Sequence, residues 1–237
     1  MSKDVIAIAG VGPGLGSAVA RAFSQAGFAA ALLARTTEAT ESLAAGLRDA
    51  GGEALALSMD ATDAESVERA FIDIGEKLGA PNVLVYNAGR FATGRVADTT
   101  PTEFERNWRI NCMGGFLCAK AALGPMLAAR RGTIIFTGAT ASLRGGKGFV
   151  NLAVGKFGLR ALAQSLAREC GPEGVHVAHV VIDGQIDTPV VRRRDPGRAS
   201  ETLIDPDAIA AAYLALHRQD PSAWTQEMDL RPAVEPF

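Results

Sequence analysis

The sequence contains few cysteines and carries almost no net charge. Three of its 237 residues are cysteine, at positions 112, 118 and 170, and they lack the spacing of metal ligands. We therefore expect reduced, mostly buried thiols, with no disulfide and no metal site. The 24 basic and 26 acidic side chains leave a formal charge of −2. This balance favours neither nucleic acid nor an anionic membrane as a partner.

Long hydrophobic runs are also missing at the N-terminus. Lys3 and Asp4 precede only a short apolar run at 5–9. That run is too short for a signal peptide or a membrane anchor. We therefore expect a cytoplasmic protein that does not engage a membrane.

The sequence does contain a regular alternation of two patterns. Short, mostly apolar runs predict strands at 5–9, 29–34, 54–58, 82–86, 133–137, 175–182 and about 226–230. Amphipathic stretches between them predict helices, two of them long, at about 102–130 and 152–171. The sequence therefore predicts an α/β fold, with one doubly wound parallel sheet of seven strands and helices on both faces. With no repeat or linker, we expect residues 1–237 to form a single domain.

A glycine-rich turn separates the first predicted strand from the first helix. Gly10, Gly14 and Gly16 give the spacing G-x-x-x-G-x-G. Gly10 would make the tight turn, Gly14 would let the backbone approach a pyrophosphate, and Gly16 would let the helix pack on the strand. No Lys-Ser/Thr pair follows, which excludes a Walker loop. The turn predicts a Rossmann-like dinucleotide site, and the alternative is a turn without a ligand.

The end of the second predicted strand bears on the choice of cofactor. An NAD site needs an acid near this point, whereas the 2′-phosphate of NADP needs a cation. Ala34 is not acidic, and Arg35 is a bidentate donor. We therefore predict NADP(H) in preference to NAD(H), the alternative being a solvated surface arginine.

Two polar side chains follow the third and fourth predicted strands, at the sheet edge where such folds bind ligands. Asp60 would accept a hydrogen bond from the adenine amine, or it caps the next helix. Asn87 would tie adjacent strand ends together and line the cofactor groove, or it serves only its own turn.

The chain resembles the short-chain dehydrogenase/reductase family over essentially its whole length. The turn 9–16 is similar to that family's TGxxxGxG, and Asn87-Ala88-Gly89 to its NAG motif. The segment 183–188 is similar to PG-x-x-x-T, with Asp183 replacing proline. With Arg35, the resemblance implies cofactor contacts at Gly10, Gly14, Leu15, Gly16, Asp60, Ala61, Asn87, Ala88, Gly89, Lys156, Ile186 and Thr188.

The catalytic segment departs from the family pattern. Asn111 and Lys156 match two members of the family's tetrad, but Leu152 stands where the tyrosine is expected and Ala139 where the serine is expected. The longer Tyr-x6-Lys spacing of related enoyl reductases falls on Phe149. The chain has only two tyrosines, and neither falls where a side chain is expected to face the nicotinamide.

The missing tyrosine is a chemical loss, because the family uses it to protonate the oxygen that becomes negative during hydride addition. A general acid contributes roughly 10²–10⁴-fold in rate. Three replacements are available: Lys156, donating directly or through a water held near Asn111, and the hydroxyls of Thr140 and Ser142. Lys156 could equally serve only to bind the cofactor.

We therefore expect an NADP(H)-dependent oxidoreductase that transfers hydride to or from a carbonyl, an alcohol or an activated C=C bond of a small molecule, with Lys156 and Asn111 as catalytic residues. The alternatives are a catalytically silent NADP(H)-binding sensor or partner subunit and non-redox chemistry in a reused pocket.

The family resemblance implies a substrate loop at about 185–204, whose Arg192-Arg193-Arg194 would bind an anionic substrate or form a solvated basic turn. It also implies a homodimer or homotetramer assembled through the two long helices and the last strand.

Overall fold

The computed structural model describes residues 3–234 and contains a seven-stranded sheet with the strand order β3-β2-β1-β4-β5-β6-β9, all parallel. Its strands are β1 (Val5–Ala9), β2 (Ala29–Ala34), β3 (Glu53–Ser58), β4 (Val83–Tyr86), β5 (Gly132–Thr137), β6 (Val175–Ile182) and β9 (Glu227–Leu230). The predicted doubly wound α/β fold is confirmed, and each predicted strand is present within one residue at its ends.

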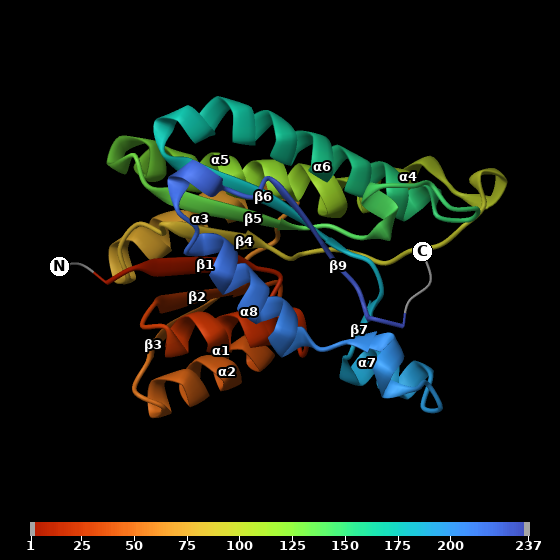
Figure 1. The fold of residues 1–237 in the computed structure, drawn as a ribbon, viewed down its shortest axis with the longest axis horizontal. Helices are drawn as coiled ribbons and strands as arrows, with labels where there is room; N and C mark the ends of the chain where they lie inside the picture. The colour runs from red at the N-terminus through yellow and green to blue at the C-terminus, as the bar shows by residue number, and fades with distance from the viewer. Residues whose placement is uncertain (1–2, 235–237) are drawn as a thin grey trace.

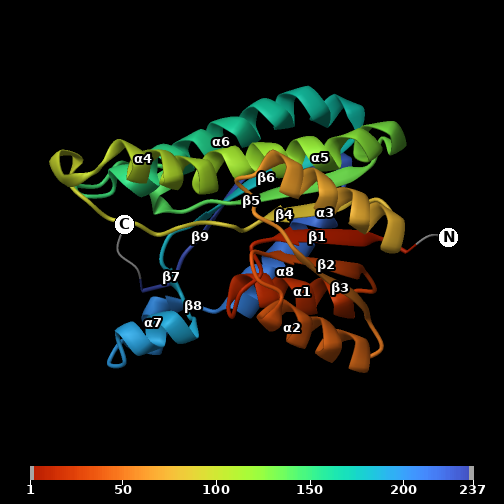
Figure 2. The ribbon, with the colours of Figure 1, turned by 180° about the vertical axis from the view of Figure 1, so that it is seen from behind.

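Helices cover both faces of the sheet (Figures 1 and 2). The principal helices are α1 (Leu15–Gln25), α2 (Glu38–Asp49), α3 (Ala64–Lys77), α4 (Pro101–Trp108), α5 (Gly114–Ala129), α6 (Val150–Cys170) and α8 (Pro206–His217). One apolar cluster joins α3, α5 and α6 to the sheet, and a second joins α1 and α8 to its other face. Successive residues of a strand point to opposite faces, so continuously apolar strands bury side chains in both clusters.

The strand order reverses direction between β1 and β4. Ala7 of β1 pairs with Ala31 of β2 on one side and Leu84 of β4 on the other. In open parallel sheets, ligands bind outside the carboxyl ends of the strands at such a point. The loops that leave β1 and β4 carry the glycine turn and the Asn87-Ala88-Gly89 segment, so the sheet brings both to this edge.

The predicted long helix at 102–130 is not continuous. A π-helical turn, Arg109–Met113, separates α4 from α5. Single π-turns are frequent at functional sites, and this one contains Asn111. Backbone hydrogen bonding at one turn was not visible in the periodicity, which is why the sequence predicted a plain helix.

The stretch Pro101–Ala129 is the one helical segment of residues 3–234 that is long and apolar enough to cross a membrane. A core helix of a soluble protein meets the same criteria, so this is weak evidence. Within this stretch α5 buries Cys118, Ala122 and Met126 against the sheet. This burial is what a helix of a globular core requires.

The predicted substrate loop at about 185–204 contains regular structure. A two-stranded ladder pairs β7 (Gln185–Ile186) with β8 (Leu203–Ile204), and α7 (Pro189–Arg194) lies between them. This small lobe projects beyond the carboxyl edge of the sheet, at the lower right of Figure 1. We call residues 185–204 the lid.

Candidate active site

The glycine turn lies against the loop that follows β4. Gly10 has a φ of 95°, and a Cβ added there would lie 2.4 Å from the backbone nitrogen of Ala88. The Asn87 side-chain amide donates to the Gly10 carbonyl at 2.8 Å. Asn87 therefore does tie the ends of β1 and β4 together, and only glycine fits at position 10.

The close packing around the start of α1 leaves no space for a Cβ atom at Gly14 or Gly16. A Cβ at Gly16 would lie 2.7 Å from the Gly10 carbonyl oxygen, and one at Gly14 would lie 2.7 Å from the Thr188 methyl carbon. Gly14 is the N-cap residue, and no side chain caps the helix. The first amides of α1 are thus left for an anion at the positive end of the helix dipole. These residues fit the pyrophosphate of a dinucleotide.

The other predicted contacts of the adenosine half lie along the same edge. The Arg35 side chain is exposed at the end of β2. The Asp60 carboxylate accepts from the amide and hydroxyl of Thr62, both at 2.8 Å. The pKa of Asp60 is lowered mainly by the Thr62 amide, with a smaller contribution from Arg35. Ala61 is buried in the apolar cluster beneath α3 and α5.

Lys156 and Asn111 come together around Gly89. A Cβ at Gly89 would lie 3.2 Å from Asn111 Oδ1 and 3.6 Å from Lys156 Nζ. Asn111 is fully buried and forms two hydrogen bonds of 3.1 Å with the backbone of Arg90. It therefore holds the loop after β4 in place from the π-helical turn.

The Lys156 ammonium group is buried and donates a hydrogen bond to a backbone carbonyl. Its Nζ donates to the Thr137 carbonyl at the end of β5, at 2.7 Å. Burial lowers the pKa of Lys156 to about 8, because a low-dielectric environment disfavours the charged form. A lysine with this pKa can exchange a proton near neutral pH.

An ion pair anchors the helix that carries Lys156. One turn further along α6, Arg160 donates to both carboxylate oxygens of Glu227 on β9, at 2.6 and 2.7 Å. His179 Nδ1 of β6 lies 3.1 Å from the same carboxylate. Burial lowers the pKa of His179 to about 4, so its ring is neutral at physiological pH and Nδ1 donates. The contact ties α6 to the edge of the sheet.

The positions of the missing serine and tyrosine are apolar in the structure. Leu152 and Ala141 are buried in a small cluster, with Ala139 and Phe149 packed against it. We call this cluster, completed by Ala153, the apolar floor. No hydroxyl replaces the tyrosine within it.

Three hydroxyls considered from the sequence are committed elsewhere. Ser142 is fully buried and accepts from the Ala139 amide at 3.1 Å. Tyr86 donates to the Ile110 carbonyl at 2.6 Å, and the Tyr213 hydroxyl lies 2.9 Å from that of Thr137. Both tyrosines are fully buried.

One polar cluster at this edge was not predicted. The Thr140 hydroxyl donates to the Asp183 carboxylate, and Arg231 Nη2 lies 3.1 Å from the other oxygen of Asp183. Asp183 occupies the position of the family's proline, which was the available signal. Its partners lie 43 and 48 residues away in the sequence, so their pairing could not be predicted.

The lid contacts the loop after β4 through an aromatic pair. Arg194 lies over the Phe91 ring, 5.9 Å from its centroid, and Phe91 packs edge to face on Phe149 at 6.0 Å. Arg192 instead forms a two-pronged pair with Asp187, at 2.7 and 2.6 Å. Two of the three consecutive arginines therefore make different contacts: Arg192 joins two segments of the lid, and Arg194 contacts the aromatic pair.

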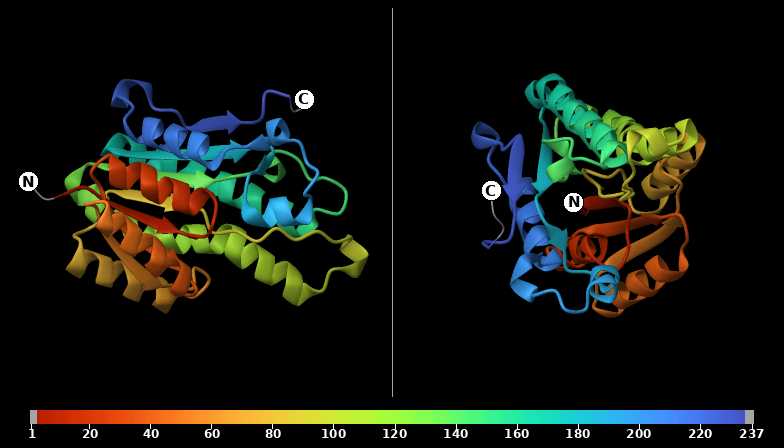
Figure 3. Two further views of the ribbon diagram at one scale, coloured as in Figure 1. Left: turned by 90° about the horizontal axis from the view of Figure 1, so that it is seen from below. Right: turned by 90° about the vertical axis from the view of Figure 1, so that its right-hand side faces the viewer.

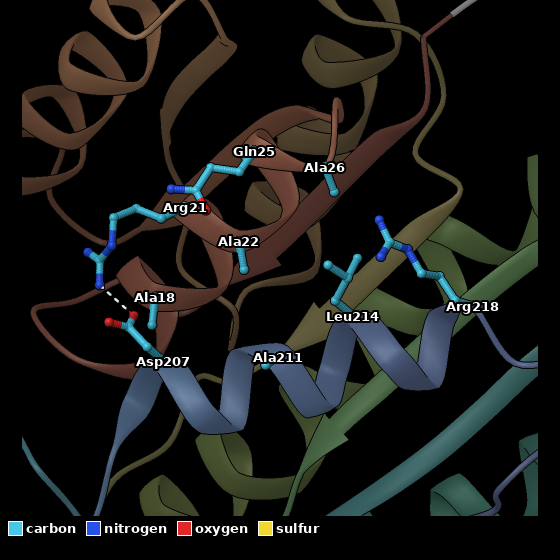
Figure 4. A pocket seen from close by; sticks show the side chains of 9 residues that line it. All are labelled: Ala18, Arg21, Ala22, Gln25, Ala26, Asp207, Ala211, Leu214 and Arg218. Carbon is cyan, nitrogen blue, oxygen red and sulfur yellow. Dashed lines mark hydrogen bonds and ion pairs between the residues drawn. The ribbon is translucent and has the colours of Figure 1, made fainter.

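A separate groove of about 520 Å³ runs between α1 and α8, which lie beside each other on one face (Figures 3 and 4). Arg21 and Asp207 form an ion pair of 2.9 Å at one end. The lining residues are Ala18, Arg21, Ala22, Gln25, Ala26, Asp207, Ala211, Leu214 and Arg218. None of the predicted site residues lines it.

Comparison with known proteins identifies the class. Residues 4–199 match the family model described as short chain dehydrogenase. The chain is 34% identical over 188 residues to a 3-oxoacyl-[acyl-carrier-protein] reductase of Bos taurus, which covers 79% of this chain and 78% of the relative. The chain therefore belongs to the short-chain dehydrogenase family, and its relatives are oxidoreductases.

Two solved structures extend the likeness to the whole chain. A short-chain dehydrogenase from Rhodopseudomonas palustris is 37% identical with a TM-score of 0.84, covering 97% of this chain and 98% of that one. An alcohol dehydrogenase from the archaeon Thermococcus sibiricus, complexed with 5-hydroxy-NADP, is 26% identical with a TM-score of 0.89, covering 100% and 99%. The fold is shared over nearly every residue.

Proposed function

We propose that this protein is an NADP(H)-dependent oxidoreductase of small molecules with an atypical active site. The observation that carries the proposal is the buried Lys156 ammonium, which meets Asn111 at Gly89 beside an intact dinucleotide turn. Burying a charge without function is costly, so a lysine kept there without the tyrosine favours a working site over a silent one. Arg35 supports NADP(H), and the archaeal neighbour holds an NADP derivative.

The chain's residues divide the task of holding the cofactor. Gly10, Gly14 and the start of α1 would hold the pyrophosphate, and Arg35 would pair with the 2′-phosphate. Gly89 would leave room for the nicotinamide ribose beside Lys156, and Ile186 and Thr188 would contact the cofactor from the lid. The bound cofactor supplies or accepts the hydride. A bidentate guanidinium–phosphate contact is among the strong charge-assisted hydrogen bonds.

Lys156 supplies the proton that the tyrosine supplies elsewhere in the family. In carbonyl reduction the developing negative oxygen takes a proton from the ammonium, directly or through one water, and the resulting amine is reprotonated from solvent. Asn111 holds the Arg90 backbone against the site. Pre-oriented reactants can contribute about 7–11 kcal/mol, so catalysis does not depend on the acid alone.

The proposal is tested by titrating NADPH fluorescence and then following absorbance at the nicotinamide band with ketones, enals and enoyl thioesters. We expect saturable NADPH binding and turnover of at least one class. Lys156→Ala should reduce turnover per bound cofactor. Tight NADPH binding with no turnover of any class would instead favour the silent binding protein.

The pH dependence of turnover follows from the lowered pKa of Lys156. Reduction needs the protonated form, so kcat for a carbonyl should fall as pH rises through about 8, approaching tenfold per pH unit above that value. Alcohol oxidation needs the neutral amine, so its kcat should rise through the same range. Stopped-flow measurements between about pH 6 and 10 give kcat for reduction and for oxidation as functions of pH. If kcat did not depend on pH in either reaction, Lys156 would be excluded as the proton donor.

We also propose a cytoplasmic homodimer or homotetramer formed through the long helices. Phe116 of α5 and Val154 and Phe157 of α6 are large apolar side chains exposed on the outer surface of these helices. Exposed large apolar side chains on two helices that contact each other favour an interface. Light scattering of the purified protein measures the assembly, and a monomer with unchanged fold would contradict it.

A further inference from the structure

The His179 ring has one nitrogen atom that the contact with Glu227 does not use. The ring is fully buried, and its Nδ1 faces the Glu227 carboxylate at 3.1 Å. Because an ionised carboxylate only accepts hydrogen bonds, Nδ1 carries the ring proton and Nε2 keeps its lone pair. Within residues 3–234, Nε2 has no hydrogen-bond partner. A buried acceptor without a donor is costly, so a donor is expected beside it.

The nearest backbone donor cannot serve Nε2. The ring tip lies against Gly138 at the end of β5, where an added Cβ would be 2.3 Å from Nε2. The Gly138 amide already donates to the Val180 carbonyl at 2.7 Å. A donor for Nε2 therefore has to be a side chain, or a water bound to one.

Lys156 brings a side-chain donor to the same place. Its ammonium group donates to the carbonyl of Thr137 at 2.7 Å, and Thr137 directly precedes Gly138. The nitrogen atoms of Lys156 and His179 therefore lie beside one peptide unit. An ammonium group has three N–H donors, and Thr137 takes one of them.

The charges around the ring agree with this proximity. Burial lowers the pKa of His179 to about 4. Among the charged groups, Glu227 raises this pKa, and Lys156 and Arg160 lower it. The ring is therefore neutral between about pH 6 and 10, and it can accept from an ammonium group throughout that range.

We propose that His179 is a positioning residue for Lys156: its Nε2 accepts a hydrogen bond from the Lys156 ammonium, directly or through one water, and Glu227 holds the ring in the tautomer that can do so. This inference rests on the proposed function, in which Lys156 supplies the proton, and adds a residue that supports that role. The bond stabilises the charged form of Lys156 in a buried site that favours the neutral amine. One N–H of the ammonium remains for cofactor or substrate.

Two substitutions of His179 separate this bond from the contact with Glu227. The amide of asparagine lies near the position of Nδ1, so His179→Asn keeps a donor to Glu227 and has no atom where Nε2 was. Glutamine is longer by one methylene group, so His179→Gln places an acceptor near the position of Nε2. His176→Asn is the matched control, because His176 is the other buried histidine of β6 and its Nε2 lies 2.8 Å from the carbonyl oxygen of Thr225.

The first measurement is kcat of carbonyl reduction as a function of pH. A hydrogen bond to a charged group is worth about one to two pKa units. In His179→Asn the fall of kcat, which is centred at about 8 in the wild type, should therefore move down by about one pH unit. His179→Gln and His176→Asn should keep the wild-type profile. Thermal unfolding and NADPH affinity show whether each variant is folded.

Two outcomes of this comparison would overturn the inference and leave the proposed function intact. An unchanged profile in His179→Asn would show that Nε2 does not act on Lys156. Equal downward shifts in His179→Asn and His179→Gln would show that the loss of the ring matters and the loss of the Nε2 acceptor does not.

A second measurement needs no turnover. The chain has five lysines, so the carbon-13 NMR signal of the Lys156 Cε can be assigned with Lys156→Arg and titrated directly. The pKa of Lys156 should be lowered in His179→Asn and unchanged in His179→Gln and His176→Asn. If the wild type turns over no substrate, the proposed function fails, and this titration alone decides the inference.

A third measurement leaves position 179 unchanged, so it does not depend on whether a His179 variant folds. Nitrogen-15 NMR of the three histidine rings shows which ring nitrogen carries the proton. We expect His179 to be protonated at Nδ1 and its Nε2 signal to move in Lys156→Met, while the signals of His176 stay in place. A proton on Nε2 of His179, or an Nε2 signal that does not respond to Lys156→Met, would overturn the inference.

Discussion

Replacing Arg35 with aspartate is expected to reverse the cofactor preference from NADPH to NADH. The Arg35 guanidinium is exposed at the end of β2, next to the Asp60 loop. Hydrogen bonds to charged groups contribute about 1.5–3 kcal/mol, so losing the proposed contact between Arg35 and the 2′-phosphate should weaken NADPH binding by about 10–100-fold. The new carboxylate repels the phosphate and accepts from the ribose hydroxyls of NADH. The ratio of the two affinities should change by about 10²–10³.

Fluorescence titration with both cofactors measures the change. Arg69→Asp is the matched control, because Arg69 is an exposed arginine of α3 and the substitution changes the net charge equally. It should leave the ratio unaltered. If Arg35→Asp leaves the ratio of NADPH to NADH affinity as unchanged as Arg69→Asp does, Arg35 is only a solvated arginine and other residues set the choice of cofactor.

The double substitution Ala139→Ser with Leu152→Tyr is expected to raise carbonyl reduction, but by less than the roughly 10²–10⁴-fold that a general acid contributes to a site without one, because Lys156 already donates a proton in the proposed mechanism. Leu152 lies four residues before Lys156 on α6, so both side chains occupy one face of the helix. A tyrosine there would meet Lys156, whose positive charge lowers the phenol's pKa. The small neighbours Ala139, Ala141 and Ala153 leave the ring few bulky obstacles.

Initial rates with 2-butanone and NADPH measure the gain. Leu152→Phe, combined with Ala139→Ser, adds the ring without its hydroxyl and separates acid catalysis from a change in pocket shape. Only the tyrosine variant should accelerate the reaction. Equal rates for the tyrosine and phenylalanine variants would show that the proton supply does not limit this enzyme.

Much of the fold was predictable because its signals are local. Continuous apolar runs indicated strands buried on both faces, and the glycine spacing indicated the turn after β1. Gly10 illustrates the physical basis: its φ of 95° and its approach to Ala88 are requirements that only glycine meets. The missing hydroxyls at positions 139 and 152 were equally visible, since a residue type is known without coordinates.

The groups that surround the reacting position depended on contacts between distant segments. The bond from Thr140 to Asp183 joins the loops after β5 and β6, and Arg194 reaches Phe91 from the lid. Neither is encoded by periodicity or by a short motif. Such pairs form only when the parallel sheet brings the carboxyl ends of its strands to one edge.

The sequence by itself thus determined the sheet, the dinucleotide turn and the loss of the tyrosine and serine, because each depends on residue types at short spacing. Only the tertiary structure decided that Lys156 is buried and has a pKa of about 8. It also decided that Ala139 and Leu152 pack into the apolar floor, and that Thr140 forms a hydrogen bond with Asp183 beside it. Burial, dielectric environment and the pairing of distant side chains are properties of the packed chain.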